Sequence, residues 1–333
     1  MQVAEGIFQV QLPLPFPLRT VNCYVLRDGD GWTIIDTGIN YPAGRAAWRA
    51  ALAELEIAPK TIQRIVLTHA HPDHYGMAGW LAERSGATVQ LAPLEQEFVR
   101  VAWHAGAANE QVIVEFFQAH GMPAELAEQV RHSMAETRTM TLPWPATSVI
   151  EPGELMQIGE RSFQVLATPG HSDQHLAFYC AEERLLLCGD AVLIKITPNI
   201  SLWPHGRPDP LADFLQSLDR LAELHVELAL PGHGPLIRTF GERLAELRAH
   251  HHERLVIMEQ AAGSGATAFS ICTAVFPTST LSPHQLRFAM AETLAHLEYL
   301  VGVGSLERAG GMYRRLLKES LTDGMHYTRR ETL

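Results

Sequence analysis

The sequence has few cysteines and no pattern that would link them. Cys23, Cys180, Cys188 and Cys272 are scattered along the 333 residues, and none belongs to a C-x-x-C pair. Disulfide frameworks occur in oxidising compartments and need several cysteines at suitable spacings. The pattern therefore argues against a disulfide framework and predicts reduced, buried thiols.

Long hydrophobic runs are also missing. No uninterrupted apolar run reaches the roughly 18 residues that a membrane-spanning helix needs. The first residues lack a basic segment followed by an apolar one, and Pro13, Pro15 and Pro17 interrupt their hydrophobicity. We therefore expect a cytoplasmic protein without a membrane partner.

Basic residues are outnumbered by acidic ones. The chain has 26 Lys and Arg against 37 Asp and Glu, a net charge of -11. Tight binding to nucleic acid depends on a basic surface that displaces counterions from phosphates. The charge argues against nucleic acid as a partner, although it leaves room for a local basic patch.

One short stretch is unusually rich in metal-binding residue types. His69, His71, Asp73 and His74 fall within six positions, directly after the strand-like run 64–67. Imidazole nitrogen and carboxylate oxygen are usual ligands of zinc and related divalent ions. A strand end followed by a turn can direct these side chains into one pocket. The alternative is an exposed His-rich loop that binds metal adventitiously.

Further candidate ligands follow other strand-like segments. His171 and His233 each end a Pro-Gly-His turn, and Asp190 follows Gly189 at the end of a strand. In such turns proline fixes φ and glycine permits a tight reversal, so the next side chain is presented at the sheet edge. The seven candidates suffice for two metal ions with one bridging carboxylate. No G-x-S-x-G motif offers a serine nucleophile instead.

The complete set resembles the ligand set of the metallo-β-lactamase superfamily, over about residues 6 to 240. The resemblance implies an α/β fold, a four-layer αββα sandwich with a dinuclear site at one edge of its two sheets. It assigns His69, His71 and His171 to one metal, Asp73, His74 and His233 to the other, and Asp190 to the bridge. Asp73 would also be catalytic, by orienting a metal-bound hydroxide. Zinc is the expected ion, with iron or manganese as alternatives.

The sequence predicts two domains. Residues 1–240 form the catalytic domain, with a helical insertion at about 93–145, and residues 241–333 form a helical tail. In the tail, Ser282-Pro283-His284-Gln285 is typical of a capping box at a helix start. The tail resembles the winged-helix-like domain of the β-lactamase-like protein 2 group. We expect the run 250–252, three histidines, to be a solvated helix face.

The resemblance and the acidic composition favour a dinuclear hydrolase that cleaves a small acyl substrate, a thioester or a lactone. The tail resemblance suggests an alternative, an endoribonuclease or phosphodiesterase acting on single-stranded RNA. A non-enzymatic sensor is a third interpretation. Lys195, Asn199 and His205, in or beside a Pro-rich loop after Asp190, are candidate substrate contacts. The sequence leaves a homodimer open.

Overall fold

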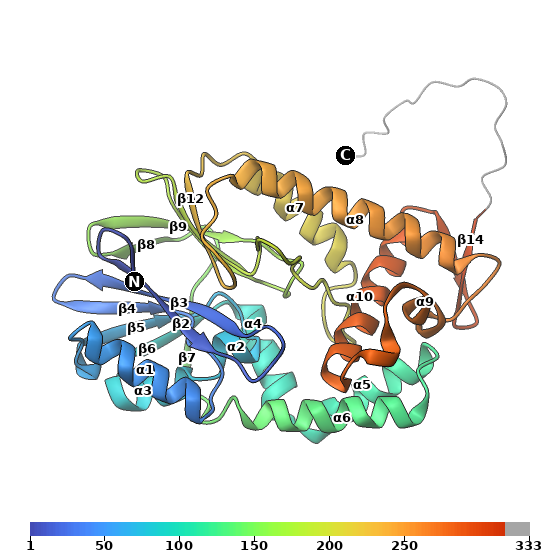
Figure 1. Ribbon diagram of the computed structural model, residues 1–333, viewed down its shortest axis with the longest axis horizontal. Coiled ribbons are helices and arrows are strands. Elements are labelled where there is room, and N and C mark those ends of the chain that lie inside the picture. The colour runs from blue at the N-terminus through green and yellow to red at the C-terminus, as the bar shows by residue number, and fades with distance from the viewer. Residues whose placement is uncertain (317–333) are drawn as a thin grey trace.

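The computed structural model describes residues 1–316, so the last part of the expected tail, 317–333, lies outside the described chain. Two β-sheets form the centre of the catalytic part (Figure 1). The first sheet has seven strands in sequence order: β1 (Gln2–Ala4), β2 (Ile7–Pro13), β3 (Thr20–Asp28), β4 (Gly31–Ile35), β5 (Ile62–Val66), β6 (Thr88–Leu91) and β7 (Thr147–Val149). The strands pair antiparallel from β1 to β4 and parallel from β4 to β7.

The second sheet has five strands. Its order is β12 (Leu228–Pro231), β11 (Leu185–Gly189), β10 (Leu176–Cys180), β9 (Arg161–Ala167) and β8 (Leu155–Ile158). Only β11 and β12 pair parallel in this sheet. Every residue of β10 and β11 is buried, because these strands are covered on both faces.

Helices cover the outer faces of both sheets. The inner faces share one apolar core, which includes Tyr24, Leu26, Phe163 and Phe178. α1 (Pro42–Glu54) and α3 (Ala78–Ser85) pack against the outer face of the first sheet (Figure 1). α7 (Pro210–Ala222) packs against the outer face of the second. The two sheets and their covering helices therefore form a four-layer αββα sandwich, as the family resemblance implies.

The remaining helices fall into two longer segments and three short turns. The segment expected as an insertion contains α4 (Pro93–Phe98), the π-helix η2 (Val99–His104), α5 (Ala107–Ala119) and α6 (Ala124–Thr139). The tail contains α8 (Phe240–Ala262), α9 (Ala268–Val275), α10 (Pro283–Gly302) and a hairpin of β13 (Leu306–Ala309) and β14 (Met312–Arg315). The short turns are η1 (Pro59–Thr61), α2 (Pro72–Tyr75) and η3 (Thr278–Thr280).

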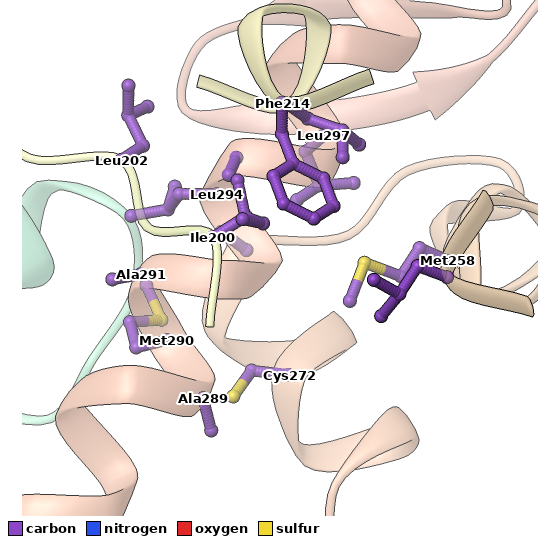
Figure 2. Close-up of a cluster of buried hydrophobic side chains, with 14 of the residues drawn as sticks. Ile200, Leu202, Phe214, Met258, Cys272, Ala289, Met290, Ala291, Leu294 and Leu297 are labelled. Atoms are coloured by element: carbon purple, nitrogen blue, oxygen red, sulfur yellow. The ribbon is translucent and has the colours of Figure 1, made fainter. Parts of the chain in front are cut away.

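α10 joins the tail to the sandwich. One buried cluster contains side chains from α7, α8, α9, α10 and the loop at 200–202 (Figure 2). The backbone N–H of Leu202 in that loop donates to the carbonyl of Ala291 on α10, at 3.0 Å. α10 also packs against α6 of the insertion. The tail and the insertion therefore hold one another beside the sandwich.

Two local expectations for the tail have different outcomes. The capping box is confirmed: the Ser282 hydroxyl accepts from the backbone N–H of Gln285, and the Gln285 side chain accepts from that of Ser282. The solvated histidine face is wrong at its central residue, because His251 is 1% exposed. Its ring lies beside His296 of α10 and against Phe214 of α7, since α8 turns this face toward the sandwich.

Candidate metal centre

The seven candidate ligands converge at one edge of the two sheets. Four of them follow β5: His69 and His71 lie in the loop after the strand, and Asp73 and His74 lie in α2. The other three follow β9, β11 and β12 of the second sheet. α2 is a single turn with Pro72 at its first position, and its chain path is fixed because Thr37 donates to the His74 carbonyl.

Three imidazoles form one half of the cluster. His69 Nε2 lies 3.0 Å from His71 Nδ1, which lies 2.9 Å from His171 Nε2. His69 and His171 are buried. Burial first, and then neighbouring imidazoles, lower the pKa of His69 and His71. Both rings are therefore held neutral, the form that binds a metal ion.

The other half combines imidazoles with carboxylates. Asp190 Oδ2 lies 3.4 Å from His74 Nε2, 3.4 Å from His233 Nε2 and 3.6 Å from His171 Nε2. Asp73 Oδ2 lies 3.3 Å from His233 Nε2. Asp190 thus stands between the two halves, where one carboxylate can reach both.

The chemistry of this donor set fits divalent cations. His74 Nε2, His233 Nε2 and Asp190 Oδ1 are buried and have no hydrogen-bond partner. Burial alone would lower the pKa of both imidazoles, but the carboxylates, led by Asp190, raise the pKa of His74 and bring that of His233 to about 10. His74 and His233 are therefore protonated in the absence of metal, and their positive charges offset the negative charges of the carboxylates. A bound metal ion would take over this role. Three overlapping groups have ligand atoms within 4.8 Å of one another: His69, His71 and His171; His69, His74 and Asp190; Asp73, His74 and His233.

Asp36 orients His74, and the sequence analysis did not identify it as a site residue. Its Oδ2 accepts from His74 Nδ1 at 2.8 Å, and its Oδ1 accepts from the backbone N–H of Thr68 at 2.8 Å. The Thr68 hydroxyl donates to the same carboxylate. Asp36 has a φ of 59°, unusual for a residue with a side chain. The sequence signal that could have identified Asp36 is an aspartate directly after a buried strand.

Two further buried residues hold the ligand loops. His175 Nε2 accepts the backbone N–H of Asp190 at 3.0 Å, and its Nδ1 lies 2.8 Å from the Thr168 hydroxyl. Glu95 accepts from the backbone N–H groups of Ala70 and Gln174, at 2.8 and 2.9 Å. Glu95 therefore links the His69–His74 loop to the loop that carries His171.

Backbone carbonyls orient two further rings of the cluster. His171 Nδ1 donates to the carbonyl of Asn199 at 2.8 Å, and His233 Nδ1 donates to that of Thr20 at 2.7 Å. Such contacts set the tautomer and direct Nε2 toward the centre of the cluster.

Two adjoining cavities open onto the cluster. The first, of about 320 Å³, has an apolar wall that includes Leu14, Phe16, Leu18, Leu193 and Phe288. The second, of about 440 Å³, lies between the insertion and the loop at 201–206. Six residues line both: His71, Phe98, Trp103, His171, Trp203 and Arg287. Since Arg287 and Phe288 belong to α10, the tail forms part of the wall.

The three candidate substrate contacts lie at different places. Asn199 lines the first cavity and His205 the second. Lys195 is exposed and lies outside both linings. The sequence analysis gave no role to Arg287 or His284 of α10, because no local motif links α10 to a site at the sheet edge.

Comparison with known proteins agrees with this geometry. Residues 17–233 match the family model described as the metallo-beta-lactamase superfamily. The chain belongs to this superfamily. Residues 255–315 match a second model, the metallo-beta-lactamase-like C-terminal domain.

Several other members of the superfamily are similar to this chain over most of its length. A metallo-beta-lactamase family protein from Thermus thermophilus is 38% identical, with a TM-score of 0.85, over 95% of this chain and 100% of that one. The probable metallo-hydrolase YqjP of Bacillus subtilis is 27% identical over 89% of this chain and 92% of its own. The acyl-coenzyme A thioesterase MBLAC2 of Bos taurus is 27% identical over 75% of this chain and 85% of its own.

Membership of the superfamily makes this protein a metallo-hydrolase. Members of the superfamily bind divalent metals through His and Asp clusters, and this chain has groups of His and Asp that could hold a metal ion. Within residues 1–316, no helix combines the length and the hydrophobicity that crossing a membrane requires.

Proposed function

We propose that this protein is a dinuclear hydrolase of small acyl thioesters, with lactones as a second substrate class. The observation that carries the proposal is the cavity of about 320 Å³ with an apolar wall that ends at the His and Asp cluster. Such a wall suits an acyl chain and orients its carbonyl toward the cluster. The similarity to a bovine acyl-coenzyme A thioesterase favours the thioester over the lactone.

In this proposal each half of the cluster holds one metal ion. His69, His71 and His171 would hold the first, and Asp73, His74 and His233 would hold the second. Asp190 would contact both. When bound, the two ions would activate a water molecule and polarise the substrate carbonyl. Zinc is the ion that this donor set favours, and iron or manganese are the alternatives.

The chain's own residues position the reactants. Asp73 lines the first cavity, where its carboxylate can orient the attacking water and accept its proton. Burial alone would raise the pKa of Asp73, but the contact with His233 and the charges of His74 and His233 outweigh burial and lower it. Asp73 is therefore ionised at neutral pH. Trp103 and Trp203 line both cavities and can exclude water from the substrate.

We also propose the division into a catalytic domain, 1–240, and a tail domain, 241–333. The family matches end at 233 and begin again at 255, on either side of this boundary. α10 gives the tail a part in substrate binding, because four of its residues line the first cavity.

An assay of the metal-loaded protein tests the function. The panel contains acyl thioesters of increasing chain length, lactones and a single-stranded RNA. We expect thioester hydrolysis that Asp73→Asn lowers at least a hundredfold, the scale of a lost general base. Metal analysis of Asp73→Asn separates loss of this carboxylate's chemistry from loss of metal. RNA cleavage without hydrolysis of any thioester or lactone would overturn the proposal in favour of a phosphodiesterase.

A further inference from the structure

Arg287 is a buried cation between the two cavities. It lies on α10, is 8% exposed and lines both cavities. Its Nε is buried without a hydrogen-bond partner, and within residues 1–316 its guanidinium belongs to no ion pair. The guanidinium carbon lies 4.4 Å from the ring centre of Phe288 and 5.9 Å from that of Trp203. Two aromatic rings thus lie beside it, where a counter-ion would be expected.

This arrangement costs free energy unless something compensates the charge. Burial lowers the pKa of Arg287 to about 10, against the opposite effect of Asp73, so the group is still cationic at neutral pH. Buried charges are normally paired or hydrogen-bonded. Asp73 is the acid whose charge acts on Arg287, but its carboxylate lies against His233. The contacts with two aromatic rings offset only part of the cost.

Within residues 1–316, few other basic side chains line these cavities. Among residues 1–316, Arg287 is the sole Lys or Arg in the lining of the first cavity, which also contains His233. The second cavity also has Arg100, but that side chain is exposed and is paired with Glu97. Apart from His233 at the cluster, the donors of Arg287 are therefore the cationic donors that a ligand in the first cavity would meet within residues 1–316.

We propose that Arg287 binds an oxyanion of the substrate, a carboxylate or a phosphate, so that the physiological substrate is an anionic acyl compound. This inference rests on the proposed acyl hydrolase function, since it adds a charged group to that substrate. A guanidinium presents a planar fork of donors that matches two oxygens of such a group. Contact with Arg287 would hold the acyl compound in one orientation beside His71 and His171, which line the same two cavities.

A binding measurement on the metal-loaded, full-length protein tests the subsite without catalysis. The probes are hexanesulfonate, a poor metal ligand, and methyl hexyl sulfone, its uncharged analogue. Trp103 and Trp203 line the cavities and provide a fluorescence signal. We expect the sulfonate to bind at least tenfold more tightly than the sulfone, because charge-assisted hydrogen bonds are the strong ones.

Variants assign this preference to one side chain. Arg287→Gln should abolish it and Arg287→Lys should keep part of it. Arg308→Gln is the matched control: it removes one tail cation that lies outside both cavities and pairs with Glu298. The ratio of the two affinities within each variant is insensitive to partial misfolding. Equal binding of both probes by the unaltered protein, or an unchanged ratio in Arg287→Gln, would overturn the proposal.

Kinetics locate the anion on the substrate. Hexanoyl and adipoyl thioesters are compared on coenzyme A, which carries phosphates, and on N-acetylcysteamine, which carries no charge. If Arg287→Gln raises KM for the adipoyl thioesters of both coenzyme A and N-acetylcysteamine, the group that Arg287 binds is the carboxylate of the acyl chain. If the substitution raises KM for the hexanoyl and adipoyl thioesters of coenzyme A but for neither thioester of N-acetylcysteamine, the group that Arg287 binds is a phosphate of coenzyme A. If Arg287→Gln leaves KM unchanged for all four substrates, the proposed anion subsite is refuted. If none of the four is hydrolysed while the sulfonate preference holds, the acyl hydrolase proposal fails and the anion subsite stands.

Discussion

Gly232 lies so close to the candidate bridging residue that no side chain fits there. A Cβ atom at this position would lie 2.2 Å from Asp190 Oδ1 and 2.7 Å from Cε1 of His74. Gly232 is not among the residues with positive φ, so its backbone accepts alanine and only the contact opposes it. At the residue scale, the second Pro-Gly-His turn thus has a steric reason for its glycine.

Gly232→Ala should therefore weaken metal binding without changing any ligand. Asp190 and His74 must move away because both distances are far shorter than a van der Waals contact. Displaced ligands lower metal affinity by roughly tenfold to a hundredfold. Competition with a chromogenic chelator measures this affinity. Gly241→Ala is the control, because a Cβ there meets nothing within 4 Å. Unchanged affinity in Gly232→Ala would contradict the placement of Asp190 between two ions.

His71→Ala and His233→Ala test the two halves of the cluster separately. His71 lies among His69 and His171, whereas His233 lies beside Asp73 and Asp190. If each half holds one ion, each variant should lose about one equivalent of metal and retain the other. Elemental analysis of the purified variants gives the stoichiometry. A variant that keeps both metals and full activity would refute the assignment of its half.

At the element scale, α10 supports the metal centre as well as the cavity wall. Glu292 of α10 accepts from the Asn199 side chain at 2.8 Å, and the carbonyl of Asn199 accepts from His171 Nδ1. The hydrogen bond between Leu202 and Ala291 fixes the same loop. The tail thus reaches His171 through two residues, neither of which would touch a metal ion.

Glu292→Leu should lower metal affinity by about tenfold, a loss typical of contacts that orient a ligand. The loop at 199 loses a polar anchor, so the His171 ring becomes less well oriented. Glu292→Gln is the matched variant: it keeps a side-chain oxygen that can accept from Asn199, and its affinity should stay near that of the unaltered protein. Chelator competition measures both. Equal losses in the two variants would show that the charge of Glu292, and not its contact with Asn199, is what matters.

At the scale of the whole molecule, two buried histidines join the tail helices to each other and to α7. His296 Nδ1 donates to the carbonyl of Glu292, so its Nε2 accepts from His251 Nδ1 at 3.1 Å. Both rings are neutral in this arrangement. Burial, followed by the charges of His296, His250 and Arg254, lowers the pKa of His251 to about 3. Burial lowers the pKa of His296 to about 4.

These shifts predict that the folded protein loses stability as the pH falls. An unfolded histidine has a pKa near 6.5, so between about pH 6.5 and pH 4 the unfolded chain takes up protons that the folded chain does not. Each ring should contribute about 2 kcal/mol to the loss of unfolding free energy between pH 7 and pH 5.

His251→Leu should flatten this pH dependence. Urea denaturation of both proteins at pH 7 and pH 5 measures the unfolding free energies, and the comparison uses the difference between the two pH values. Acid release of metal affects both proteins alike, so it cancels. A variant that loses as much stability as the unaltered protein would contradict the role of this histidine pair.

The candidate ligands could be predicted because their signals are local. His69 to His74 directly follow a buried strand, and both Pro-Gly-His turns end strands of the second sheet. Asp36, Glu95 and His175 were harder to recognise. Each acts on a residue contributed by another segment, so its partner cannot be identified from the neighbouring positions in the sequence.

The types of metal-binding residue, the strand ends that present them and the capped start of α10 could be predicted from short-range patterns. These follow from residue type, turn geometry and hydrogen bonds within a few positions. Three features follow only from the packing of distant segments: α10 lines the cavity, Arg287 is buried without an ion pair within residues 1–316, and His251 is buried in a helix face expected to be solvated. Burial and charge pairing depend on what other segments bring to a side chain. For Arg287 those segments include Asp73 and Trp203, which are distant in sequence and adjacent only after folding.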